Sequence, residues 1–260
     1  RSGWRLQPDG TGAIPLEAVR AALRPDTILV SLMMVNNESG AVMPIADMIR
    51  ITRRLSPLAL FHTDAVQGFL KVPFKAKTLG ADLISVSGHK IHGPKGVGAL
   101  YIRPGLPLPP FIHGGGQESN FRSGTENLPG ICGFAAACAA TDAQQEIARM
   151  TDLRDYCRAR AQEIPGLVLI GQQAAPHIVN LSLPGLRSQG IINCLQTKQI
   201  YVSAGSACSK GHRSHVLEAM RLPPAVIDGS VRISFCGDNT REDVDRLIDA
   251  LLEAKTTLKG

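Results

Sequence analysis

The sequence has no CxxC pair, although it contains six cysteines, at positions 132, 138, 157, 194, 208 and 236. None of them has the spacing to histidine that zinc ligands show, so we expect no metal site. Six unpaired thiols are typical of a reducing compartment, and we therefore expect a cytoplasmic protein.

Long apolar runs and dense clusters of charge are missing as well. No apolar segment approaches the length of about 20 residues that a membrane-spanning helix needs. The first residues resemble neither a signal peptide nor a transit peptide, so we expect no membrane association. The formal charge of +6 comes from 28 Lys and Arg that are scattered along the chain. Scattered charge favours an ordinary solvated surface, and we expect no direct contact with nucleic acid.

With 260 residues, of which 44% are hydrophobic, the chain can bury a substantial core. In the first half, the strand-like segments 28–35, 58–64 and 82–87 alternate with helical patterns at 15–23 and 44–55. This alternation predicts an α/β sheet. The continuous apolar character of 28–35 further predicts a parallel strand that is covered on both faces.

The second half has a different pattern. After a Pro- and Gly-rich connection at 104–116, helical segments at 129–140 and 144–163 precede three short strand-like segments at 168–170, 178–182 and 231–235. This order predicts a smaller α+β domain. We therefore expect a first domain at residues 1–140 and a second at 141–260.

Polar residues follow three of the predicted strands. Asn37, Asp64 and Ser87 each lie where an apolar strand ends. In open α/β sheets, ligands bind beyond the carboxyl ends of the strands, so these three residues are candidates for one binding site.

Lys90 lies just beyond one of these strand ends, in Ser87-Gly88-His89-Lys90. A lysine that forms a Schiff base must lose its proton, and a partly buried position suits that role better than a solvated surface. A carboxylate such as Asp64 could pair with the ring nitrogen of a pyridine cofactor. Taken singly, Lys90 could equally be a surface cation and Asp64 a helix cap.

Several ordered motifs decide between these interpretations. The chain resembles the cysteine desulfurases, a branch of the class V aminotransferase group with the type I pyridoxal-phosphate fold, in Val35–Gly40, His62–Gln67, Ser85–Gly96, Gly114–Glu118 and Arg122–Thr125. The resemblance implies pyridoxal 5'-phosphate as cofactor and a mixed, mostly parallel sheet in a partial large domain, followed by a small C-terminal domain. The family also has an N-terminal segment on the order of a hundred residues that this sequence lacks, so we expect an N-terminally truncated chain.

The resemblance also implies a role for each matching residue. Lys90 would bind the cofactor covalently, Asp64 would pair with the pyridine nitrogen, and His89 would join Lys90 as a catalytic residue. The remaining cofactor contacts would come from Asn37 and Gln67 near the ring hydroxyl, Ser87 and His89 at the phosphate, and Thr125 at the phosphate of the other subunit. The last of these contacts implies a homodimer.

A second chemical element surrounds Cys208, in Gly205-Ser206-Ala207-Cys208-Ser209-Lys210-Gly211. Small neighbours leave its sulfur accessible, and the nearby Lys210 or His212 could favour the thiolate. By the resemblance, Cys208 attacks the sulfur of L-cysteine, and alanine and a persulfide are formed. Arg232 would bind the substrate carboxylate. A protein acceptor, either an iron–sulfur scaffold or a tRNA thiolation enzyme, would then receive the sulfur.

Three other interpretations stay open. A selenocysteine lyase or cysteine-sulfinate desulfinase could share the same cofactor site, as could an aminotransferase, but Cys208 favours cysteine as substrate. A cofactor-free scaffold that docks a sulfur carrier has no chemical need for Lys90, Asp64 and Cys208 together. Cys132 and Cys138 lie in an apolar helical context, where we expect small core residues without chemistry.

Overall fold

The first half of the chain forms a four-stranded mixed sheet. The computed structural model describes residues 3–171, 175–204 and 213–258. The strand order is β1-β2-β3-β4. The first three strands are parallel, and the fourth is antiparallel to β3, which confirms the predicted α/β fold with a mixed, mostly parallel sheet. The strands are β1 (Leu29–Met33), β2 (Leu60–Asp64), β3 (Leu83–Ser87) and β4 (Gly98–Ile102).

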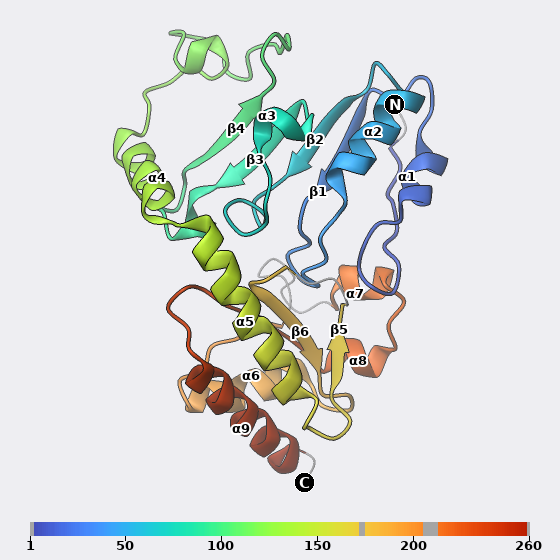
Figure 1. Cartoon of the computed structure of the whole chain (residues 1–260), viewed down its shortest axis with the longest axis vertical. Coiled ribbons are helices and arrows are strands. Elements are labelled where there is room, and N and C mark those ends of the chain that lie inside the picture. Colours follow the sequence, from blue (N-terminus) through green and yellow to red (C-terminus); the bar gives the residue numbers. More distant parts are fainter. Residues whose placement is uncertain (1–2, 172–174, 205–212, 259–260) are drawn as a thin grey trace.

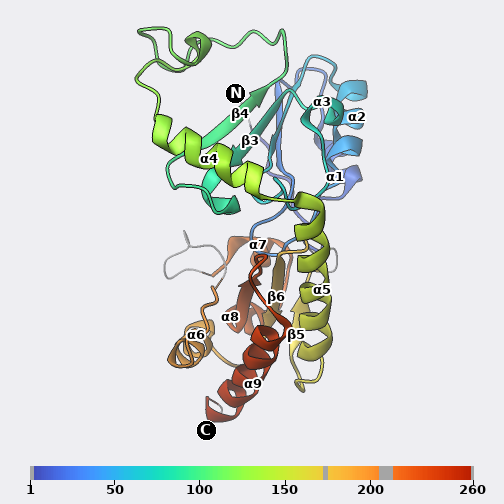
Figure 2. The same ribbon diagram turned by 60° about the vertical axis from the view of Figure 1, so that its left-hand side comes forward.

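Helices lie on both sides of this sheet, as Figure 2 shows. The first three helices lie on one side and α4 lies on the other. The core of this half includes Phe61, Ile84 and Met48, all buried between the sheet and α2. The helices are α1 (Leu16–Ala22), α2 (Ile45–Leu55), α3 (Ala76–Leu79) and α4 (Leu128–Ala140).

The expectation that the first strand is covered on both faces is wrong. β1 is an edge strand, and Leu29 is 52% exposed. Its open face continues across the sheet as a polar row, in which the His62 ring hydrogen-bonds Ser31 Oγ at 2.8 Å through Nδ1 and Ser85 Oγ at 2.9 Å through Nε2. Ser31 on this face is exposed, so a continuous apolar run does not by itself show that a strand is buried.

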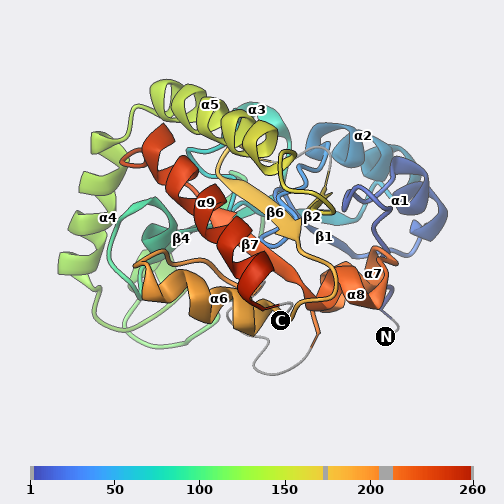
Figure 3. The same cartoon turned by 90° about the horizontal axis from the view of Figure 1, so that it is seen from below.

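The second half forms a three-stranded antiparallel sheet in the order β5-β6-β7, as the α+β prediction expects. The long helices α5 and α9 lie side by side along it, with α6 next to α9 (Figures 1 and 3). The elements are β5 (Val168–Ile170), β6 (Ile178–Ser182), β7 (Ser230–Ser234), α5 (Ala143–Ala161), α6 (Ser188–Thr197), α7 (His215–Ala219), α8 (Pro224–Asp228) and α9 (Arg241–Thr257).

Each sheet has its own apolar core. The core of the second half includes Leu181, Val231 and Leu251. Ile178, at the start of β6, instead packs into the core of the first half. The predicted boundary between residues 140 and 141 falls in the link between α4 and α5 and stays a prediction.

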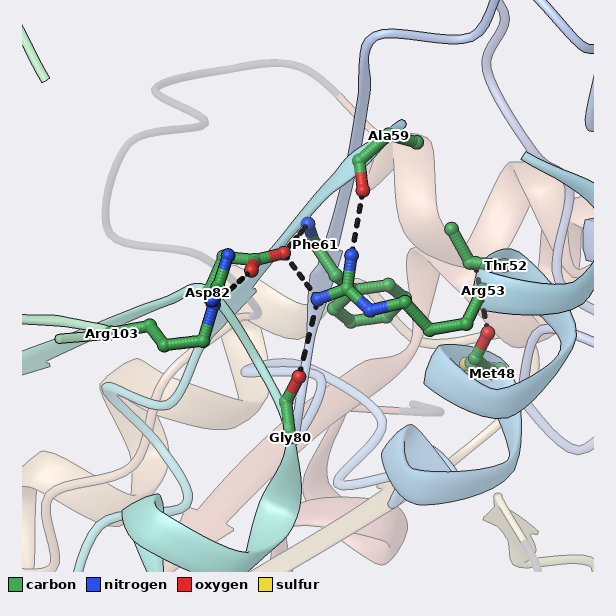
Figure 4. A network of polar contacts seen from close by, with 8 residues as sticks. All are labelled: Met48, Thr52, Arg53, Ala59, Phe61, Gly80, Asp82 and Arg103. Carbon is green, nitrogen blue, oxygen red and sulfur yellow. Dashed lines mark hydrogen bonds and ion pairs between the residues drawn. The ribbon is translucent and has the colours of Figure 1, made fainter. Parts of the chain in front are cut away.

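At the amino end of β3, a buried carboxylate joins three elements (Figure 4). Asp82 is fully buried, and it accepts from Arg53 at 2.5 Å, Arg103 at 2.7 Å and the Phe61 amide at 2.7 Å. Burial alone would raise the pKa of Asp82, but these hydrogen bonds outweigh it and hold the pKa below the ordinary value of 3.8. The cluster stabilises the sheet edge opposite the strand ends where the candidate residues lie.

Between β4 and α4 the chain projects from the body as an arm that carries the short 3-10 helix η2 (Glu118–Asn120) (Figure 1). The helix α4 that follows is apolar almost throughout, yet Gly130 is its only buried residue. The expectation that Cys132 is a core residue is wrong, because its side chain is exposed, and Cys138 is half-buried. Among the described helices, none combines the length and the apolar composition needed to cross a bilayer.

Candidate functional site

The carboxyl ends of the parallel strands meet at one edge of the sheet, as the sequence predicts. Asp64 is the last residue of β2 and Ser87 is the last residue of β3. The strand register pairs Met33 with Asp64, and Asp64 with Ser85. Three consecutive strand ends therefore place their following turns next to one another.

Lys90 lies immediately beyond β3, in the 3-10 helix η1 (Gly88–Ile91). Close packing of glycines fixes this turn. A Cβ atom on Gly98 would lie 2.5 Å from the Val86 carbonyl oxygen, and one on Gly88 would lie 3.2 Å from Phe134 of α4. The glycines of the motif thus let β4 and α4 approach the turn that carries Lys90.

The neighbours of Lys90 have defined partners. Ser87 Oγ and His89 Nδ1 are 2.6 Å apart, so the two residues expected at a phosphate are already hydrogen-bonded to each other. Asp64 Oδ1 accepts from the Val66 amide at 2.9 Å. Asp64 therefore does act as a local turn cap. Its second carboxylate oxygen has no hydrogen-bond partner within the described residues.

The side chain of Asn36 holds the turn after β1. Asn36 Oδ1 accepts from the amides of Glu38 and Ser39 at 3.0 and 2.9 Å. This turn presents the backbone carbonyl of Asn37, which accepts from Arg232 Nη1 at 2.8 Å. The predicted residues Asn37 and Arg232 are thus in direct contact, across the junction between the two halves of the chain.

Arg232 lies on β7, and its backbone pairs with Ser203, from which the chain leads toward Cys208. The guanidinium is half-buried. Burial lowers the pKa of Arg232, and the nearby Glu38 carboxylate partly offsets that shift. Its Nε atom is buried without a hydrogen-bond partner among the described residues. Arg232 therefore has an unused donor at the junction.

His177 is a site residue that the sequence analysis missed. It is 2% exposed, and its Nε2 atom lies 3.0 Å from Oε1 of the predicted residue Gln67. Burial, assisted by the positive charges of Lys71, Arg232 and Lys90, lowers the pKa of His177 to about 2. His177 therefore lies among the candidate residues of both halves. A single histidine before a strand carries no sequence signal for such a position.

Lys71 was missed for a similar reason. Burial, assisted by the charge of Lys90 and opposed by Cys236, lowers the pKa of Lys71 to about 8. The preceding residue, Leu70, has φ 58°, a strained conformation for a bulky side chain. Backbone strain of this kind is common at functional sites, and here it directly precedes a half-buried lysine.

These side chains form a basic site. The positive charges of Lys71, Lys90 and Arg232 act on neutral His177, and the carboxylate of Glu38 acts on Arg232. Such a donor set, with the hydroxyl of Ser87 and the amide of Gln67, fits an anionic ligand with several acceptor oxygens. Within the described part of the chain, no cluster of His, Cys, Asp or Glu could hold a metal ion.

One predicted residue, Thr125, is not brought into this cluster. Thr125 is exposed, three residues before α4, on the returning part of the projecting arm. Cys208 lies outside the described residues. Cys157 is buried in the second core, and burial raises the pKa of its thiol to about 12, which makes it unreactive.

Comparison with known proteins shows which proteins the chain resembles. The family model described as Aminotransferase class-V matches residues 4–247. The chain is 41% identical over 253 residues to the Cysteine desulfurase IscS of Dictyoglomus turgidum and 40% identical over 261 residues to that of Methanosarcina thermophila. These alignments cover 95% and 98% of this chain, but only 64% of either relative. The chain therefore spans somewhat less than two thirds of these relatives.

Solved structures also resemble this chain. A protein described as NIFS-LIKE PROTEIN superimposes with a TM-score of 0.90 at 37% identity, covering 98% of this chain and 68% of that one. A structure titled SspA in complex with cysteine has a TM-score of 0.74 at 32% identity and covers 91% of this chain and 67% of the other.

Proposed function

Because the chain belongs to the aminotransferase class-V family, we propose that it is a pyridoxal-phosphate-dependent cysteine desulfurase, which converts L-cysteine to L-alanine and transfers the sulfur to Cys208. The observation that carries this proposal is the buried contact between Gln67 and His177, on whose ring the positive charges of Lys90 and Arg232 act. Relatives of 38–41% identity named cysteine desulfurases support it.

The residues fit the cofactor that the family uses. Lys90 would bind it covalently, and Ser87 and His89 would share its phosphate. Asp64 keeps a carboxylate oxygen available for the pyridine nitrogen, and Asn37 and Gln67 would lie near the ring hydroxyl. Bound pyridoxal phosphate supplies an electron sink for cleavage of bonds in an attached amino acid.

Lys90 and His89 would carry out the proton transfers. Lys90 Nζ would accept a proton from the substrate α-carbon. His89 is held by Ser87 through Nδ1, which leaves its Nε2 to exchange a proton with the ligand. We therefore propose both as catalytic residues.

Arg232 suits the substrate carboxylate. Its Nη1 is held by the Asn37 carbonyl and its buried Nε has no described partner. A carboxylate is the acceptor that best satisfies a partly buried guanidinium. The solved relative whose title names bound cysteine supports an amino acid of this size as ligand.

The segment that carries Cys208 begins and ends beside this carboxylate site. On one side, the backbone of Ser203 pairs with Arg232 at 3.1 and 2.6 Å. On the other side, Ser214 Oγ donates to the Glu38 carboxylate. In the proposed step, Cys208 Sγ forms a bond to the substrate sulfur, and the bond from that sulfur to the substrate β-carbon breaks with its electron pair left on the carbon. The β-carbon takes up a proton, and the proton that Lys90 accepted returns to the α-carbon to give alanine.

We further propose a homodimer in the cytoplasm, in which Thr125 contacts the cofactor phosphate of the other subunit. Its exposure on the projecting arm supports such a role. The persulfide would pass to a protein acceptor that serves iron–sulfur cluster assembly or tRNA thiolation.

The test combines a cofactor measurement with a product measurement. We expect a visible absorbance band when pyridoxal phosphate is added, reductive trapping with borohydride to label Lys90, and alanine release from L-cysteine without a keto acid. Lys90→Ala should lose all three, whereas Lys95→Ala, which changes an exposed lysine nearby, should keep them. Alanine release that depends on a keto acid would instead indicate an aminotransferase.

A further inference from the structure

The carboxamide of Gln67 is held from the opposite half of the chain. Gln67 lies in the turn after β2, and His177 directly precedes β6, 110 positions later. Both side chains are buried, at 8% and 2% exposure, and their polar atoms lie 3.0 Å apart. The backbone of His177 is itself fixed, because its carbonyl accepts from the Phe235 amide at 2.9 Å.

The protonation state of His177 decides which way this hydrogen bond runs. With the pKa lowered to about 2, His177 is neutral at physiological pH and carries one N–H. The partner atom at Gln67 is the carbonyl oxygen, which can only accept. Nε2 must therefore carry the hydrogen and donate it. Nδ1 is left as a buried acceptor without a partner among the described residues.

This arrangement sets the polarity of Gln67. With its oxygen engaged by His177, the carboxamide presents its NH2 group, which makes no hydrogen bond within the described residues. A reversed carboxamide would present its oxygen instead and would repel an anionic ring oxygen. Lys71 and Lys90 make the surroundings positive, which also favours an anionic acceptor.

We propose that His177 is a positioning residue, which fixes Gln67 as a hydrogen-bond donor to the ring oxygen of pyridoxal phosphate. The inference rests on the proposed function, because it takes that cofactor as the ligand. His177 itself need not touch the cofactor. Its contribution is to exclude the orientation of Gln67 that cannot bind.

The first measurement needs no cofactor. Nitrogen-15 spectra of the histidine rings should show His177 with a protonated Nε2 and a bare Nδ1, unchanged between pH 5 and 8. A ring that titrates in this range, or that carries its proton on Nδ1, would overturn the proposal.

The second measurement is a variant cycle on cofactor binding. His177→Phe keeps a ring but removes the donor, and it should weaken pyridoxal phosphate about tenfold, the effect of one hydrogen bond to a charged group. Gln67→Ala should lose a similar factor. The double variant should also lose about tenfold rather than a hundredfold, since both changes remove the same interaction. His177→Gln, which retains a donor, should recover most of the affinity.

A spectroscopic readout separates positioning from general structural damage. In the loaded protein, His177→Phe and Gln67→Ala should shift the pH midpoint of the visible band by the same amount. His215→Phe, at an exposed histidine, should leave it unchanged. If the losses of cofactor affinity in the two single variants add up in the double variant, the role of His177 is overturned and the proposed function is not. Absence of cofactor binding in the unmodified protein would overturn the proposed function together with this role.

Discussion

The hydroxyl of Ser214 donates a hydrogen bond to the buried carboxylate of Glu38, 176 positions earlier in the chain. The same Ser214 Oγ accepts from the Leu217 amide at 3.1 Å and thereby caps α7. The backbone carbonyl of Glu38 accepts from Asn180 Nδ2 on β6 at 3.1 Å. Glu38 is therefore the residue at which the turn after β1, the second sheet and the chain that returns from Cys208 meet.

Ser214→Ala should lower the free energy of unfolding by about 2 kcal/mol, because it removes a helix cap and leaves a buried carboxylate without its donor. Urea unfolding would measure the loss. Thr257→Ala, at an exposed hydroxyl, should change stability by less than about 0.5 kcal/mol. Equal effects of the two changes would contradict a structural role for Ser214.

Asp82→Asn should lower the free energy of unfolding by about 3 kcal/mol at neutral pH, because it removes the charge that pairs two arginines with a buried carboxylate. The pH dependence has a definite sign. The pKa of Asp82 is lowered in the folded state, so its contribution is present above the ordinary value of 3.8 and is lost as the pH falls through the folded-state pKa.

The difference between Asp82→Asn and the unmodified protein should therefore shrink as the pH is lowered from about 5 toward 2. Asp26→Asn, at an exposed aspartate without a described ion pair, is the matched control and should show little effect. A difference that grows toward acid pH would mean that the Asp82 carboxylate is not stabilised by its arginines.

The sequence predicts those parts of the site that depend on one strand and the turn after it. Asp64 and Ser87 could be placed at strand ends because apolar runs stop there, and parallel pairing then brings the ends together. The glycines around Lys90 could be recognised as a motif because they lie close together in the sequence, near the turn after β3.

His177 could not be predicted, because its role arises from a contact between residues 110 positions apart. The exposed face of β1 and the exposed apolar surface of α4 were missed for a related reason. The apolar composition of a segment shows that it can be buried. Whether it is buried depends on which other elements of the fold cover it. The surroundings of Lys71 likewise come from three separate elements of the fold.

Lys71→Met should stabilise the ligand-free protein at pH 7, by about 1–3 kcal/mol, since it removes a buried charge. The pKa of Lys71 is about 8 in the folded chain, against an ordinary 10.5, so the unfolded chain binds more protons between these values. The charge of Lys71 lowers the stability of the folded protein by its full amount below pH 8, and this loss fades as the pH rises toward 10.5. The stability gain of the variant should fade over the same range, in urea unfolding at pH 7, 9 and 10.

An anionic ligand should reverse the order of stability of the unmodified protein and Lys71→Met. Pyridoxal phosphate should stabilise the unmodified protein more than Lys71→Met, because the ammonium gains a partner. Lys77→Met, at an exposed lysine, should neither gain stability at pH 7 nor respond to pyridoxal phosphate differently from the unmodified protein. The groups that act on Lys71 are Lys90 and His177, and Cys236 shifts its pKa in the opposite direction to Lys90. A gain in stability of Lys71→Met that does not depend on pH would point to apolar packing alone.

Arg232→Lys should separate carboxylate binding from the later steps of the proposed reaction. A lysine keeps the charge but loses the planar pair of donors that a guanidinium offers to a carboxylate, and it cannot hold the Asn37 carbonyl with a second donor fixed in place. We expect KM for L-cysteine to rise about 10–100-fold. The change in kcat should be smaller, because Lys90 and Cys208 remain. Arg246→Lys, at an exposed arginine on α9, should leave both constants unchanged. If Arg232→Lys lowered kcat with KM unchanged, Arg232 would act on the transition state and not on the bound carboxylate, because an interaction lost only in the transition state leaves KM as it was.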